Sequence, residues 1–155
     1  MNIDDPCGSL WRYSPTATAL KSTIVPYSSQ IEYDPKDAWS IFTDDESGNW
    51  MTTNTPNAGA SLTFTNVRAV AIHSPLILGH STYAVELDDQ LITRAGGGAF
   101  NASTWWWISD SLLFFKDGLD PGQKHTIRLL NIEEDSGVDL TVRSFEVWQV
   151  EGTSP

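Results

Sequence analysis

The chain has 155 residues, which suits one domain with a sizeable core and is short for two. Nine Lys and Arg residues against twenty Asp and Glu residues give a net charge of -11 at pH 7, which argues against nucleic acid or an anionic membrane as a partner. Cys7 is the single cysteine, so no disulfide can form within the chain, and no run of about 18 apolar residues suits a membrane span.

Residues 1–27 predict an N-terminal extension that packs on the domain. Prolines punctuate short apolar pieces there, and Trp11 and Tyr13 offer rings for the packing. The start MNIDDPCGSLW lacks the basic and apolar regions of a signal peptide. We predict the extension over 1–27, a single folded domain over 28–151 and a tail over 152–155.

From residue 29 onward the apolar residues recur with a period of two, which is typical of half-buried strands. Turn clusters rich in Gly, Pro and Asp separate these segments at intervals of about ten residues. The pattern predicts an all-β fold, an antiparallel β-sandwich or jelly roll. Its apolar positions are Ile31 and Tyr33, Leu62 and Phe64, Val70 and Ile72, Tyr83, Val85 and Leu87, Ile127 and Leu129, and Val138, Leu140 and Val142.

The segment AWSIFTDDESGNW combines two tryptophans with an acidic turn. Trp39 is expected in the core, whereas Trp50 follows Gly and Asn and is expected to be exposed. Asp44, Asp45 and Glu46 could coordinate calcium, but the spacing does not match an EF-hand loop. We favour a solvated acidic turn, so that no cofactor is expected and a structural calcium ion is the less favoured reading.

His73 and His80 flank the loop SPLILGHS, whose apolar tip either forms a contact surface or folds back over the end of the sandwich; we favour the second. Three glycines then precede Asn101, in RAGGGAFNAS, and permit backbone positions closed to other residues. Asn101-Ala-Ser is also a glycosylation sequon, which is meaningful in a secreted protein. A glycan there would crowd the tryptophans that follow.

Trp105, Trp106 and Trp107 cannot all be core if they lie in a strand, because consecutive side chains point to opposite faces. If Trp106 faces inward, Trp105 and Trp107 lie on the outer face about 7 Å apart and form a platform that suits the apolar face of a pyranose. The opposite phase buries both and leaves Trp106 outside. We favour the first phase, with Trp50, His80 and Asn101 as partners at the rim of the platform.

Near the C-terminus the apolar residues fall at even positions through Val142 and at odd positions from Phe145 onward. This shift by one residue predicts a bulge near Arg143 and Ser144. His125, in QKHTIRLLN, is expected to order the turn that enters a strand. No motif of a hydrolase, metalloprotease or nucleotide-binding loop is present, and the carboxylates Glu133, Glu134 and Asp135 share one turn, so we do not expect an enzyme.

Four segments carry a resemblance to a known group of proteins: GASLTFTNVRAVAIHS, LGHSTYAVELDD, SLLFFKDGLDPGQKHTIRLLN and SFEVWQV. Over residues 29–150 they resemble β-sandwich ectodomains of fungal cell-surface and secreted proteins, related to galactose-binding-like carbohydrate-binding modules. The resemblance implies secretion or a place at the cell surface, with EGTSP as the start of a stalk. It also implies an acidic residue before the aromatic residue of the last strand, where this chain has Ser144, so a carried-over calcium site is not expected.

Two functions follow. The first is a non-catalytic carbohydrate-binding module or lectin-like domain that binds a glycan or cell-wall polysaccharide through exposed tryptophans, with no nucleic acid and no direct membrane contact. The alternative is a structural or protein-interaction ectodomain of a fungal cell-surface protein, in which the tryptophans belong to the core. Truncating the tryptophans separates the two, because a platform residue affects binding and a core residue affects folding.

Overall fold

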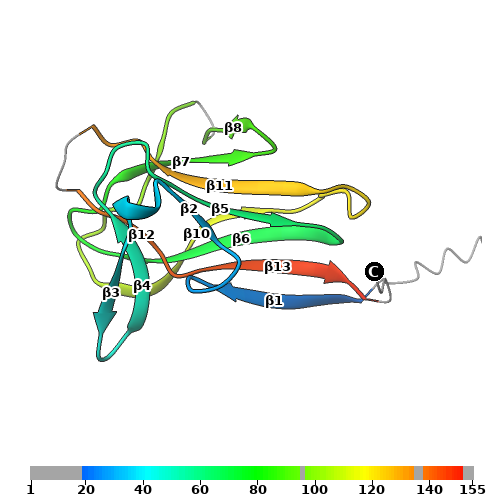
Figure 1. Ribbon diagram of the computed structural model, residues 1–155, viewed down its shortest axis with the longest axis horizontal. Coiled ribbons are helices and arrows are strands. Elements are labelled where there is room, and N and C mark those ends of the chain that lie inside the picture. The colour runs from blue at the N-terminus through cyan, green and yellow to red at the C-terminus, as the bar shows by residue number, and fades with distance from the viewer. Residues whose placement is uncertain (1–18, 95–96, 135–137, 152–155) are drawn as a thin grey trace, which may run out of the picture.

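The computed structural model describes residues 19–94, 97–134 and 138–151, and Figure 1 shows an antiparallel β-sandwich with a smaller sheet at one end. The predicted fold class is confirmed. Among the described residues the helical structure is the short 3-10 helix η1 (Lys36–Ala38). None of the described residues forms a helix with the length and hydrophobicity needed to cross a membrane.

One layer of the sandwich is a sheet in the order β1-β13-β6-β10. Its strands are β1 (Leu20–Pro26), β6 (Val67–Leu76), β10 (Ile108–Lys116) and β13 (Ser144–Val150).

The other layer is a sheet in the order β2-β5-β11-β7-β8, with β9 also paired to β7. Its strands are β2 (Glu32–Asp34), β5 (Gly59–Phe64), β7 (Thr82–Leu87), β8 (Gln90–Ile92), β9 (Phe100–Asn101) and β11 (His125–Asn131).

A third sheet, in the order β12-β4-β3, extends from one end of the sandwich (Figure 1). Its strands are β3 (Ser40–Asp44), β4 (Gly48–Thr53) and β12 (Leu140–Val142). The β3–β4 hairpin reaches outward from this end, and this hairpin later forms one wall of the candidate site.

The core lies between the two large sheets and is formed by the alternating residues that the period-two pattern predicted. In β11 the buried Ile127 lies opposite Leu62 of β5 and opposite Leu87 of β7, and Leu129 lies opposite Val85. Side chains at paired positions share one face of a sheet, so the pattern in each strand adds to the same core. The predicted burial of Trp39 is also confirmed.

The shift in the alternation of apolar residues after Val142 has a different cause from the predicted bulge. β12 ends at Val142 in the small sheet, and β13 begins at Ser144 in a large sheet, so Arg143 is the residue at which the chain changes sheets. The Arg143 N–H donates to the His73 carbonyl at 3.0 Å, and the Arg143 carbonyl accepts from Tyr27 N–H at 2.9 Å. The register irregularity of β13 against β6 lies instead between Trp148 and Gln149.

The described part of the predicted N-terminal extension is an integral edge strand. β1 pairs with β13 along its whole length, from Leu20 opposite Val150 to Pro26 opposite Ser144. The sandwich therefore includes strand residues before residue 28, which were predicted to belong to the extension. Cys7, Trp11, Tyr13, Asp135 and the tail 152–155 lie outside the described residues.

Candidate functional site

The three tryptophans do not lie in a strand. β9 ends at Asn101 and β10 begins at Ile108, so Trp105, Trp106 and Trp107 occupy the loop between them. Their exposed fractions are 85%, 78% and 48%, so Trp106 is exposed and its predicted inward position is wrong. The alternation of strand side chains does not apply to irregular backbone, and this is the physical reason for the difference.

The loop begins with local hydrogen bonds that position its backbone. Asn101 Oδ1 accepts from the Ser103 N–H at 2.7 Å, an Asx-type turn, and Ser103 forms an isolated parallel bridge with Ile77. Asn101 therefore uses its side-chain oxygen to shape the loop that carries the indoles. Its side chain is exposed, but it does not line the cleft described below.

Trp107 is held more closely than its two neighbours. Its indole Nε1–H donates to Ser47 Oγ at 3.3 Å, and its ring lies 5.8 Å from the ring of Trp50, at an interplanar angle of 53°. Trp50 also stacks on Phe42, with centroids 5.0 Å apart and planes 20° from parallel. The result is an aromatic row, Phe42, Trp50 and Trp107, that joins the hairpin to the tryptophan loop.

Trp50 is 1% exposed, so the prediction that it is exposed is wrong. Its sequence neighbours Gly48 and Asn49 suggested a loop, whereas Trp50 lies in β4 opposite Phe42. The rings of Phe42 and Trp107, eight residues before it and 57 after it, are among the groups that pack against it. Trp50 serves as the back support of Trp107 and does not present a surface to a ligand.

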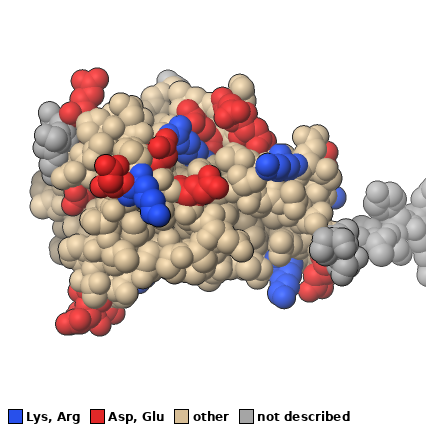
Figure 2. Space-filling view, in the orientation of Figure 1, with Lys and Arg blue, Asp and Glu red and all other residues tan. Residues whose placement is uncertain are grey.

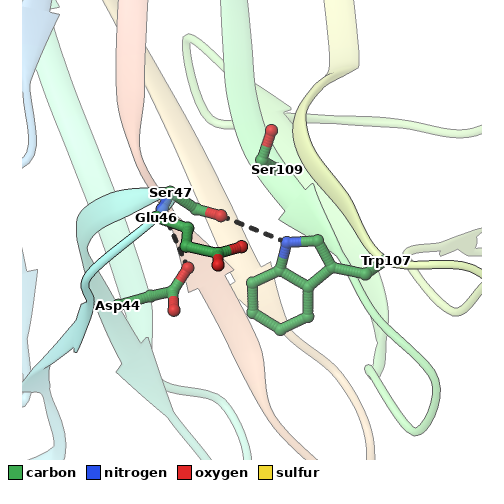
Figure 3. A pocket seen from close by; sticks show the side chains of 5 residues that line it. All are labelled: Asp44, Glu46, Ser47, Trp107 and Ser109. Carbon is green, nitrogen blue, oxygen red and sulfur yellow. Dashed lines mark hydrogen bonds between the residues drawn. The ribbon is translucent and has the colours of Figure 1, made fainter.

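The tip of the β3–β4 hairpin brings polar groups to Trp107. Asp44 lies opposite Gly48, and Asp44 Oδ2 accepts from the Ser47 N–H at 2.9 Å. Gly48 has a φ of +87°, a left-handed conformation that glycine adopts without steric cost. This turn places Glu46 and Ser47 beside the indole, as Figure 3 shows.

These groups line an open cleft of about 440 Å³. Trp107 provides an aromatic face, Ser47 and Ser109 contribute hydroxyl groups, and Asp44 and Glu46 contribute carboxylates (Figure 3). An aromatic face beside hydrogen-bonding groups can hold a ligand that has apolar C–H groups on one side and hydroxyl groups around its edge. We name this set of five residues the Trp107 cleft.

Arg143 supports the Trp107 cleft from behind. Its guanidinium lies 6.0 Å from the ring centroid of Trp50, and its Nη1–H donates to the Ser109 carbonyl at 2.6 Å. A Cβ added to Gly48 would lie 3.2 Å from Arg143 Nη2. The sequence pointed to Arg143 only through the shift in the alternation of apolar residues after Val142, so its role at the site was missed.

His80 does not reach the Trp107 cleft. The residue is buried, its backbone forms a parallel bridge with Asp139, and its Nδ1 has no hydrogen-bond partner within the described residues. Burial lowers the pKa of His80, and the charge of Asp139 opposes that shift. The predicted position of His80 at the rim is wrong, because the residue is buried beside Asp139 and is not among the residues that line the cleft.

The acidic turn forms a wall of the Trp107 cleft. Among the described residues no three His, Cys, Asp or Glu side chains come together in a way that could hold a metal ion. Ser144, which stands where the resemblance implies an acidic residue, is buried on β13.

Comparison with known proteins gives structural neighbours and no sequence relatives. No protein-family description and no curated protein matches the sequence. The structure is similar to the CBM36-1 domain of a multidomain xylanase from the hindgut metagenome of Trinervitermes trinervoides, with a TM-score of 0.52, 11% identity, and coverage of 87% of this chain and 99% of that chain.

A family 6 carbohydrate-binding module gives a TM-score of 0.50 at 9% identity, over 83% of this chain and 94% of that chain. A family two carbohydrate esterase from Cellvibrio japonicus gives 0.56 at 12% identity, over 85% of this chain and 35% of the esterase, so this chain spans about a third of it. At such identities the likeness shows a shared fold, the β-sandwich of carbohydrate-binding modules.

Proposed function

We propose that this chain is a non-catalytic carbohydrate-binding module that holds a glycan in the Trp107 cleft. The observation that carries the proposal is the half-exposed Trp107, whose ring is fixed by Trp50 and Ser47 and faces hydroxyl and carboxylate groups. A ring held in place before binding loses little conformational freedom when a ligand stacks on it. Trp105 and Trp106 lie beside it and are free to extend the contact.

The fold supports this proposal by its size as well as its shape. This chain covers 99% of the CBM36-1 domain and 94% of the family 6 module, so nearly the whole of each module corresponds to this chain. By contrast, it corresponds to 35% of the esterase.

The arrangement of carboxylates supports a binding role without catalysis. Asp44 and Glu46 lie two residues apart on a single hairpin tip. Glycoside hydrolysis uses two carboxyl groups on opposite sides of the bond that breaks. An extracellular location and a place at a fungal surface accompany this proposal as predictions.

The direct test replaces Trp107 and measures polysaccharide binding by affinity electrophoresis and tryptophan fluorescence. Trp107→Ala should weaken binding by about thirtyfold, equivalent to about 2 kcal/mol for a stacked indole. Trp107→Phe, which keeps an aromatic face, should retain part of the affinity. Trp105→Ala should change the free energy of unfolding by under about half a kcal/mol, because that side chain is exposed.

The proposal fails if Trp107→Ala binds as well as the parent chain to every polysaccharide that the parent binds. It also fails if a broad array of neutral and charged glycans gives no binding to the parent chain. Melting curves for each variant show whether a loss of binding reflects a loss of folding.

A protein-interaction domain is the second candidate, favoured by the outer face of the sheet β1-β13-β6-β10. One row across this sheet is Ile24, Glu146, Ala71 and Phe115, and both of its end residues are large, apolar and about half or more exposed. Light scattering over a concentration series tests for self-association through this face. A monomer at every concentration, together with glycan binding, leaves the first proposal in place.

A further inference from the structure

Negatively charged side chains outnumber positively charged ones around the Trp107 cleft. Asp44 and Glu46 line it, and Asp45 completes the same hairpin tip. Within the described residues, Arg143 is the cation placed at this site by a specific contact, and its guanidinium is directed to the Trp50 ring and the Ser109 carbonyl. Two carboxylates therefore line the cleft and a third lies on the same hairpin tip, whereas the one guanidinium placed here is already hydrogen bonded to Ser109.

The wider surface adds to this field. Figure 2 shows acidic side chains at the end of the molecule where Figure 1 places the β3–β4 hairpin and at several other places on the same face. The whole chain carries a net charge of -11. Negative charge around a cleft raises the local concentration of cationic ligands and repels anionic ones.

Resting on the proposed function, we propose that the glycan recognised in the Trp107 cleft carries primary amines, as in a polymer of glucosamine. The amino group of glucosamine is attached directly to the pyranose ring. A ring stacked on Trp107 therefore places its ammonium group at the level of the surrounding carboxylates, and an ammonium near an indole face gains a cation–π attraction. A glycan of uronic acids would bring like charges together at the same position.

The other chemistry that could join these carboxylates to a sugar is a bridging divalent cation. The described residues offer no group of three metal-ligating side chains at this place. The ammonium supplies the compensating charge from the ligand itself, so the preference should persist in the presence of a chelator.

The experiment compares the hexamers of glucosamine, N-acetylglucosamine and glucose by isothermal titration at about pH 5.5, with EDTA throughout, at low salt and at about 0.5 M salt. The glucosamine hexamer should bind about three- to tenfold more tightly than either neutral hexamer, the range expected for one or two exposed ion pairs. The preference should shrink at high salt, because the pairs are exposed to solvent.

Two variants locate the preference. The double variant Asp44→Asn and Glu46→Gln removes the charges and keeps an acceptor for the Ser47 N–H, so the glucosamine hexamer should lose its advantage over the neutral hexamers. Asp89→Asn is the matched control at the far end of the sandwich, in the turn between β7 and β8, and should keep the preference.

Four outcomes overturn the inference. Equal or weaker binding of the glucosamine hexamer overturns it while the proposed function stands. A preference that survives the double variant shows that the carboxylates of the cleft do not cause it. A preference that Asp89→Asn reduces equally assigns the effect to the overall charge and not to the cleft. Failure of every hexamer and of the wider glycan array to bind refutes the proposed function, and the inference with it.

Discussion

Trp107 differs from Trp105 and Trp106 because its ring has partners on the hairpin. The Ser47 hydroxyl and the Trp50 ring hold the indole from two sides, and Trp50 is in turn stacked on Phe42. The two exposed neighbours have no ring contacts with aromatic residues of the described chain. One tryptophan of the three is thus preorganised, and the other two can adjust to a ligand.

Another residue with a defined environment is His125, which orders the turn before β11 as predicted. Its Nδ1 lies 2.7 Å from Asp88 Oδ2, and its Nε2 lies 3.0 Å from the Asp120 carbonyl. Both partners are acceptors, so an imidazolium, which donates from both nitrogens, satisfies them. The hydrogen bond that His125 donates to Asp88 is the main cause of the raised pKa of His125. For Asp88, burial alone would raise the pKa, but its hydrogen bonds with His125 and the Thr126 N–H and the charge of His125 lower it overall.

These shifts predict how stability depends on pH. Because the folded-state pKa of His125 is raised, its stabilisation is complete below the ordinary value of 6.5 and is lost as pH rises through the folded-state pKa. The contribution of Asp88, whose pKa is lowered, is complete above its ordinary value of 3.8 and is lost as pH falls through the folded-state pKa. The pair therefore contributes most between these two ordinary values.

Urea unfolding at about pH 5.5 and about pH 8.5 measures this contribution as the difference between the parent chain and Asp88→Asn, because His80, whose pKa is lowered by burial, changes stability in the opposite direction in both chains. Asp88→Asn removes the main cause of the raised pKa of His125, so on going to the higher pH the variant should lose less stability than the parent chain. An equal change in the two chains would contradict the prediction.

At the scale of elements, the β3–β4 hairpin links the fold to the candidate site. Its turn requires the left-handed φ of Gly48, and Arg143 lies close to the position of a Cβ there. Gly48→Ala should lower the free energy of unfolding by about 1–2 kcal/mol from the backbone conformation alone. It should also weaken glycan binding severalfold, because Arg143 must shift and Trp107 rests on the same hairpin.

Gly118→Ala is the matched control for this prediction. Gly118 has a φ of +73°, and a Cβ there would meet no atom within 4 Å. It follows β10 at the end remote from the hairpin, so its substitution should lower stability by a similar amount and leave binding unchanged. Equal losses of binding in the two variants would show that stability and not hairpin geometry controls affinity.

The strands could be predicted from the sequence, whereas the site could be predicted only in part. Period-two alternation is a local property of each strand, so Val85, Ile127 and Leu129 were identified as core. The exposure of Trp105 and Trp107 was predicted by assuming a strand that the loop does not form. The burial of Trp50 and the role of Arg143 depend on contacts between residues distant in the sequence, and no local pattern reports such contacts.

At the scale of the whole molecule, stability comes from one core between two large sheets and from the edge strands that close it. β1 completes its sheet by pairing with β13, and both Val25 and Phe145, which lie opposite each other, are buried in the core. No described part of this core is built around clustered metal-ligating groups.

We expect that EDTA shifts the melting temperature by only about one or two degrees. A bound structural ion would stabilise the folded state by mass action, and its removal by EDTA would lower the melting temperature further than this. Differential scanning fluorimetry with EDTA and with excess calcium measures this shift. A fall of about ten degrees on chelation would contradict the prediction and indicate a structural ion.

The pairing of β1 with β13 also determines how the domain can be attached to something else. The Glu151 N–H donates to the Ala19 carbonyl at 3.0 Å, so the two ends of the sandwich strands lie together, and the β3–β4 hairpin lies at the opposite end of the long axis (Figure 1). Immobilising the domain on a bead or a sensor surface at the end that holds Ala19 and Glu151 therefore places the attachment at the end remote from the Trp107 cleft.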